Sequence, residues 1–249
     1  MSNLHFKIIV PMYNVEEWVE TTIKSVKEQT YKDYQCILVD DISTDDTVKV
    51  VRKLIKGDKR FKLIVNKEKK YACQNIYEAT LKAKPSDEDV IVNLDGDDWL
   101  ANRNVLRKVS EVYSDKDVLL TYGNHINYPD GEPPWPLFAY PENIVKENRY
   151  REFRYLGSHL RTYKYKLWKN LKVEDLQDKD GNFYQMGGDV ALMVPLCELA
   201  GDRARFISDV LYVYNNKNPN NDYKLDHSLQ YSVEQEIRQK AKYNKLELS

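Results

Sequence analysis

The fold is decided by "VIVNLDGDDWL", residues 90–100, where a hydrophobic run leads directly into three carboxylates. The run from Val90 to Leu94 is typical of a buried strand, and Asp95, Asp97 and Asp98 stand where that strand ends. Like charges this close repel one another and cost stability unless a cation or several hydrogen-bond donors compensate. The stretch therefore predicts a strand that ends at a ligand site.

Short β-branched runs predict further strands on both sides of this one, at 5–10, 35–39, 61–65 and 117–122. Apolar residues at helical spacing predict helices around 15–26, 48–55 and 76–83. Strands that alternate with helices form an α/β fold, a Rossmann-type, mostly parallel sheet flanked by helices. Ligands of such sheets bind where the carboxyl ends of the strands converge, and the acidic run lies at one of these ends.

A proline-rich segment predicts the main internal boundary, because five of the nine prolines fall between residues 129 and 141. We expect residues 1–128 and 129–225 to form two halves of one domain, followed by a helical tail at 226–249. The tail carries a thin apolar stripe of Leu229, Val233, Ile237 and Ala241. This stripe can pack on its own domain or on a second copy in a homo-oligomer.

Composition excludes several classes of protein. Lys and Arg number 38 and Asp and Glu 39, so no excess of positive charge indicates nucleic-acid binding. Three widely spaced cysteines do not form a disulfide framework and fit a reducing compartment. No signal peptide and no apolar run of membrane-spanning length is found. We expect a soluble, cytoplasmic protein without a transmembrane segment.

The "DGD" triplet at 95–97 has the chemistry of a cation site. In an extended chain Asp95 and Asp97 point to the same side, and Gly96 lets a ligand approach the backbone. Two hard oxygen donors suit Mn²⁺ or Mg²⁺, which would bridge the protein to a diphosphate. The alternative is a capped turn in which Asp98 is the N-cap of a following helix.

Three other polar motifs stand at predicted strand ends or helix starts. In "VPMYN" (10–14), Pro11 is expected to end a strand and Asn14 to cap a helix. In "LVDDISTDDT" (38–47), Asp41 belongs to a pair that can bind an imide N–H or a ribose hydroxyl of a nucleotide. In "GGDVALM" (187–193), Asp189 is either a helix N-cap or a general base.

The order and spacing of these motifs resemble the family 2 glycosyltransferases, which have the GT-A fold. The resemblance covers roughly residues 5–215 and is more specific before residue 130. It implies that Pro11, Tyr13, Asn14 and Asp41 line the nucleotide pocket of a sugar-nucleotide donor.

The resemblance also implies the catalytic roles. Asp95 and Asp97 would correspond to the DxD motif, with Asp97 as the direct metal ligand, and Asp189 would be the catalytic base. Lys217, in "YNNKNPNND" (214–222), would contact the diphosphate.

One loop departs from the family pattern, since residues 66–80 carry Asn75 but lack the usual arginine. Asn75 is retained as a donor-binding candidate, and Lys67, Lys69 or Lys70 are possible substitutes for the arginine. In "GSHLRTYKYKLW" (157–168), His159 and Arg161 could contact the acceptor or a phosphate, or form a surface patch.

The resemblance implies an inverting transfer from a nucleotide-diphosphate sugar, UDP-linked by family habit, to a hydroxyl of a glycan acceptor. A divalent metal, Mn²⁺ or Mg²⁺, would assist the departure of the diphosphate. Two alternatives are a sugar-phosphate nucleotidyltransferase and a non-catalytic sugar-nucleotide or glycan-binding module. The first would normally have a glycine-rich loop after the first strand, whereas this chain has "PMYN". A dinucleotide-binding oxidoreductase is excluded because no GxGxxG motif occurs.

Overall fold

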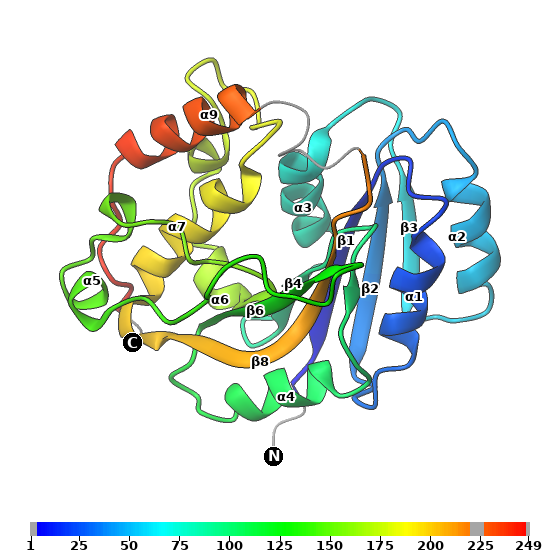
Figure 1. The fold of residues 1–249 in the computed structure, drawn as a ribbon, viewed down its shortest axis with the longest axis horizontal. Helices are drawn as coiled ribbons and strands as arrows, with labels where there is room; N and C mark the ends of the chain where they lie inside the picture. Colours follow the sequence, from blue (N-terminus) through cyan, green and yellow to red (C-terminus); the bar gives the residue numbers. More distant parts are fainter. Residues whose placement is uncertain (1–3, 220–226, 248–249) are drawn as a thin grey trace.

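A single curved sheet with strand order β3-β2-β1-β4-β7-β6-β8-β5 organises the computed structural model, which describes residues 4–219 and 227–247 (Figure 1). Strands β1 to β4 run parallel, β7 runs antiparallel to both of its neighbours, and β6 and β8 are parallel to each other. The strands are β1 (Phe6–Met12), β2 (Tyr34–Asp40), β3 (Phe61–Val65), β4 (Val90–Asn93), β5 (Trp99–Leu100), β6 (Leu120–Tyr128), β7 (Arg161–Lys164) and β8 (Ala204–Asn215).

Helices cover both faces of the sheet (Figure 1). They are α1 (Val19–Lys27), α2 (Thr47–Ile55), α3 (Tyr71–Lys82), α4 (Val105–Val112), α5 (Glu142–Lys146), α6 (Tyr165–Trp168), α7 (Gly188–Ala200) and α9 (His227–Gln239), with short 3₁₀ turns at η1 (Tyr150–Glu152), η2 (Val173–Leu176) and η3 (Gly201–Arg203). Among the described residues, no helix combines the length and the apolar character needed to cross a membrane.

Two apolar clusters form the core, one on each face of the sheet. Alternate side chains of β1 enter opposite clusters: Ile8 packs with α1 and α4, and Ile9 packs with α3 and α7. This alternation explains why β1 is apolar on both faces, as expected of a central parallel strand. The predicted α/β architecture with a mostly parallel N-terminal sheet is confirmed.

The predicted strand boundaries need two corrections. Pro11 does not end β1, which continues to Met12. Its carbonyl points toward β4 and accepts a hydrogen bond from the Gly96 amide, beyond the last β4 residue. An N–H at position 11 would point to the same side, where β4 has already ended, so proline costs the sheet no hydrogen bond. The strand predicted at 117–122 is β6 (Leu120–Tyr128), because the buried Val118 and Leu119 precede the ladder.

The C-terminal helix packs on its own chain. Ile237 of α9 is buried in the cluster that contains α7. Next to this helix, the Arg151 guanidinium of η1 donates to both carboxylate oxygens of Glu198 on α7, at 2.7 and 2.9 Å, and to the Ile237 carbonyl. The Tyr243 amide donates to the same carboxylate at 3.1 Å. One buried ion pair therefore joins η1, α7 and the C-terminal segment.

Removal of one partner of this pair should destabilise the fold strongly, because the other charge stays buried. We expect Arg151→Met to lower the free energy of unfolding by about 3–5 kcal/mol, measured by urea denaturation. Arg149→Met is the matched control and should change the stability little, since Arg149 pairs with Glu147 and Glu152 on the surface, where solvent screens the charges. The double variant Arg151→Met/Glu198→Leu should recover much of the loss. Equal losses for Arg151→Met and Arg149→Met would contradict this account.

Candidate active site

A tight turn follows β4 and creates the acidic cluster. The strand ends at Asn93, and the Asp98 amide then donates to the Asp95 carbonyl at 3.1 Å. This bond brings residues i and i+3 together, so Asp95 and Asp98 converge. Strand alternation therefore does not determine the directions of Asp95 and Asp97, because the chain is no longer extended there.

Gly96 is required by packing inside the protein, contrary to the expectation that it admits a ligand. A Cβ at this position would lie 2.8 Å from the Pro11 carbonyl oxygen and 2.6 Å from Met12 Cγ. The turn after β4 therefore packs tightly against the end of β1, and a larger residue at position 96 would displace it.

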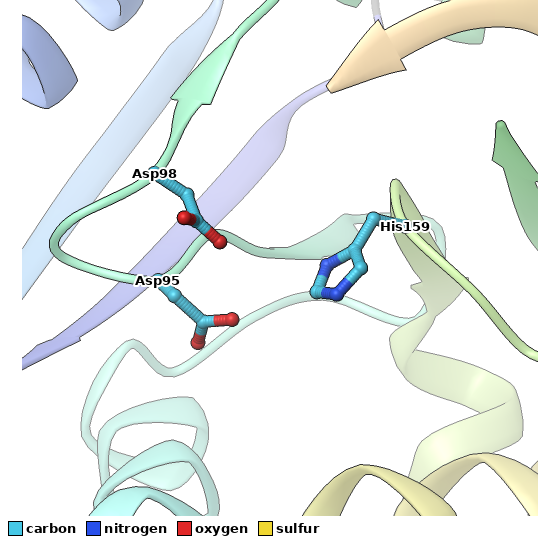
Figure 2. Close-up of side chains that lie close together, drawn as sticks. All are labelled: Asp95, Asp98 and His159. Atoms are coloured by element: carbon cyan, nitrogen blue, oxygen red, sulfur yellow. The ribbon is translucent and has the colours of Figure 1, made fainter. Parts of the chain in front are cut away.

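Asp95, Asp98 and His159 form a group of possible metal ligands. One donor atom from each residue lies within 4.8 Å of the other two, and Figure 2 shows both carboxylates pointing toward the imidazole ring, which faces them from the other side. Carboxylate oxygens with an imidazole nitrogen suit a transition ion such as Mn²⁺ better than Mg²⁺. The sequence predicts His159 only as a contact to the acceptor or a phosphate, and no local signal marks it as a metal ligand.

Asp98 is held from the far strand β8. Its carboxylate accepts the Tyr212 hydroxyl at 2.6 Å and the Asn215 amide at 2.7 Å. Asp98 is not a helix N-cap, because β5 follows it directly. Burial, with the nearby charges of Asp97 and Asp95, raises the pKa of Asp98 well above its usual value. The repulsion between the carboxylates is thus offset by hydrogen bonds from Tyr212 and Asn215 and by the raised pKa of Asp98.

Asp97 lies outside this ligand group and contacts the segment after β8. The Asn218 side-chain amide donates to its carboxylate at 2.7 Å. In the same segment the Lys217 amide donates to the Asn215 side chain at 3.0 Å, and the Lys217 ammonium lies 5.4 Å from the Tyr128 ring centroid. The predicted diphosphate contact Lys217 is therefore close in the chain to groups that hold the acidic turn.

Arg161 connects two other predicted site residues. Its guanidinium donates to the Asp189 carboxylate and to His159 Nε2, each at 3.0 Å. Arg161 and His159 are both buried, so the alternative that they form a surface patch is wrong. Burial lowers the pKa of His159 well below its usual value, and the Arg161 charge acts in the same direction. The imidazole is accordingly neutral, and its single lone pair accepts the Arg161 hydrogen bond, which a metal ion on His159 would have to displace.

Two glycines determine where Asp189 lies. Gly187 is the N-cap of α7 in a left-handed conformation (φ 67°), and Asp189 is in the first turn, so Asp189 is not the N-cap. A Cβ on Gly188 would lie 2.7 Å from Cys73 Cβ on α3. The start of α7 is therefore in direct contact with the first turn of α3.

A second cluster gathers the predicted nucleotide-binding residues at the ends of β1 and β2. The Asp41 carboxylate accepts the Lys70 and Tyr71 amides at 2.9 and 2.8 Å. The Asn66 side chain donates to Asp41 (2.8 Å) and Asn75 (2.7 Å). Burial alone would raise the pKa of Asp41, but these hydrogen bonds lower it below its usual value.

Tyr13 and Asn14 complete this cluster. The Lys69 ammonium lies 2.9 Å from the Tyr13 ring centroid and 3.4 Å from the Asp41 carboxylate. Asn14 accepts the Thr44 amide and links the ends of β1 and β2. It does not cap α1, which begins at Val19. Lys69 is thus the lysine of its loop that reaches both Tyr13 and Asp41.

The profile of glycosyl transferase family 2 matches residues 7–172, which include both the cluster around Asp41 and the acidic turn after β4. The chain belongs to this family. One relative is glycosyltransferase GlyG of Streptococcus pneumoniae, which is 25% identical to this chain over 226 residues. The match covers 87% of this chain and 72% of GlyG.

Two solved structures share the GT-A fold with this family 2 chain. Staphylococcus aureus TarS 1–349 in complex with UDP-GlcNAc superposes with a TM-score of 0.67 at 19% identity, over 86% of this chain and 59% of TarS 1–349. Mannosyltransferase PcManGT of Pyrobaculum calidifontis in complex with GDP-Man and Mn²⁺ gives 0.59 at 20% identity, over 88% and 58%. The chain also spans 46% of an uncharacterized glycosyltransferase of Haemophilus influenzae, with 32% identity over 120 residues.

The contact between Gly188 and Cys73 can be tested by a double-mutant cycle. We expect Gly188→Ala to destabilise the protein by about 1–3 kcal/mol, because the added methyl overlaps Cys73 Cβ. Cys73→Gly removes that atom, so the same change should cost at least ~0.5 kcal/mol less in the Cys73→Gly background. Urea denaturation of the four proteins gives the coupling energy, and a coupling near zero would argue against the contact.

Proposed function

We propose that this chain is an inverting glycosyltransferase that moves a sugar from a nucleotide-diphosphate sugar, UDP-linked by preference, to a hydroxyl of a glycan acceptor. The observation that carries the proposal is the position of the acidic turn after β4. It lies between the Asp41 cluster and Asp189, which is bound to Arg161 beside His159. A donor that extends from the Asp41 cluster across the acidic turn would bring its anomeric carbon toward Asp189.

The residues present fit a divalent cation, since the donor atoms of Asp95, Asp98 and His159 already converge within 4.8 Å. Two ligand sets share Asp95: the Asp95–Asp97 pair of the family motif, and Asp95 with Asp98 and His159. When bound, the cation would neutralise the charge that develops on the departing diphosphate. Lys217 would add a positive charge on the same side of the diphosphate.

Asp189 is the proposed general base. The Arg161 guanidinium, 3.0 Å away, pairs with this carboxylate and fixes its position beside His159. Asp189 would take the proton of the acceptor hydroxyl as that oxygen attacks the anomeric carbon opposite the diphosphate, which inverts the configuration. His159 and Arg161 would contact the acceptor or a donor phosphate from the same side.

The proposal also covers the division of the chain and its location in the cell. Residues 1–128 would bind the donor, and residues 129–225 would supply the acceptor site and the base. The three cysteines are free and buried, an observation that supports a reducing, cytoplasmic location.

Donor binding should be visible as thermal stabilisation. We expect one of the UDP, GDP, CDP and dTDP sugars, at about 100 times its dissociation constant and with Mn²⁺, to stabilise the fold by about 2.7 kcal/mol. Omission of Mn²⁺ should reduce the shift. If the Asp95–Asp97 pair is the ligand set, Asp97→Asn should abolish the metal-dependent part, whereas loss only in Asp98→Asn would assign the ion to Asp95, Asp98 and His159. No shift with any donor would overturn the proposal in favour of a glycan-binding module.

Removal of the base should slow turnover without loss of the donor. We expect Asp189→Asn to lower kcat by roughly 10²–10⁴-fold, the usual contribution of general base catalysis, while the donor-induced thermal shift is retained. Asp180→Asn, an exposed aspartate in the preceding loop, is the control and should have wild-type kcat. Weak donor binding with normal turnover in Asp189→Asn would assign Asp189 to the donor pocket instead.

A further inference from the structure

The loop between β6 and α5 carries an exposed tryptophan. Trp135 is 52% exposed, and it stands in the sequence "PPWP" between Pro134 and Pro136. Proline fixes the backbone φ angle, so these neighbours restrict the conformations through which the indole could fold back onto the core. Tryptophan is enriched at interfaces, and a side chain kept exposed in this way is available to a ligand.

A continuous row of rings connects Trp135 with the acidic turn. Trp135 meets His125 edge to face at 6.5 Å between ring centroids, His125 meets His159 at 5.3 Å, and His159 stacks on Tyr212 at 4.3 Å. The Tyr212 hydroxyl then donates to Asp98. Trp135 is therefore three ring contacts away from the acidic turn and lies at the outer end of the row.

The sheet order puts Trp135 on the side of the acidic turn opposite the nucleotide cluster. Tyr13 and Asp41 follow β1 and β2, which lie on one side of β4. Trp135 follows β6, which lies on the other side of β4 beyond β7. Because β7 is antiparallel to both β4 and β6, the carboxyl ends of β4 and β6 meet at the same edge of the sheet. A molecule on Trp135 would thus approach the reaction centre from the acceptor side.

We propose that Trp135 is a stacking platform for a sugar unit of the acceptor, beyond the unit that receives the transferred sugar. This inference rests on the proposed function. The electron-rich face of an indole attracts the polarised C–H groups on the face of a hexopyranose. A lipid chain would instead require aliphatic side chains along the row. The acceptor is therefore an oligosaccharide of at least two units.

Phe138 offers a matched control on the same loop. It is 40% exposed, but the Arg154 guanidinium lies 4.6 Å from its ring centroid and occupies one face. It takes no part in the ring contacts that lead to His159. Loss of Phe138 should therefore alter the loop surface without altering the acceptor platform.

The test begins with an array of defined mono- to tetrasaccharides, probed with wild-type protein in the presence of UDP and Mn²⁺. The glycan bound best is then used as acceptor in steady-state kinetics. We expect Trp135→Ala to raise the KM for this glycan by roughly tenfold or more with kcat within twofold, since it removes binding common to ground and transition states. Trp135→Phe should restore most of the affinity, and Phe138→Ala should behave as wild type. The stabilisation by donor should be unchanged in all three variants.

Three outcomes would overturn the platform. These are an unchanged acceptor KM in Trp135→Ala, an equal rise in Phe138→Ala, and no glycan bound by a wild-type protein that still shows the donor shift. A loss of binding to phospholipid vesicles in Trp135→Ala, in place of glycan binding, would assign the loop to a lipid surface. Failure of the proposed function itself is distinguishable, because the wild-type protein would then show no donor-induced stabilisation.

Discussion

Mutual repulsion among carboxylates at the end of β4 is the constraint on which the arrangement of this site depends. The turn brings Asp95 and Asp98 together in a buried position, and such a cluster persists only when donors surround it. Those donors come from far along the chain. The β8 residues Tyr212 and Asn215 bind Asp98, and Asn218 binds Asp97. The need of these three carboxylates for hydrogen-bond donors therefore connects β8 and the residues after it to the end of β4.

Arg161 is the positive charge that balances this cluster. It is buried beside His159 and Asp189, and its charge opposes the rise in the pKa of Asp95 that burial produces. A buried arginine is stable only with several acceptors, and here Asp189, His159 and the Gly157 carbonyl fill that role. The same contacts orient Asp189, so the electrostatic balance of the core and the geometry of the proposed base have a common origin.

Local patterns carry much of the N-terminal half, as β1 to β4 and the helices between them are continuous apolar runs alternating with amphipathic segments. The strand β7 carries no such signal: it consists of Arg161–Lys164, with two basic residues that are buried only because the fold supplies partners. His159 joins Asp95 and Asp98 as a consequence of β7 pairing with β4, a long-range contact that no sequence spacing records. The pairing of Asp95 with Asp98 likewise depends on a turn that is closed by the packing of Gly96 on β1.

The close contact of Gly188 with Cys73 has a consequence for the exchange of segments between family members. The N-terminal residues to about 128 carry α3, and the later residues carry the glycines before Asp189, so a chimeric protein joined near this boundary inherits the two sides of the contact from different parents. At 2.7 Å there is no room for a side chain larger than glycine at position 188 opposite Cys73. A chimera that joins the N-terminal half of one parent to the C-terminal half of another is therefore expected to be more stable when both parents share this small-residue pairing.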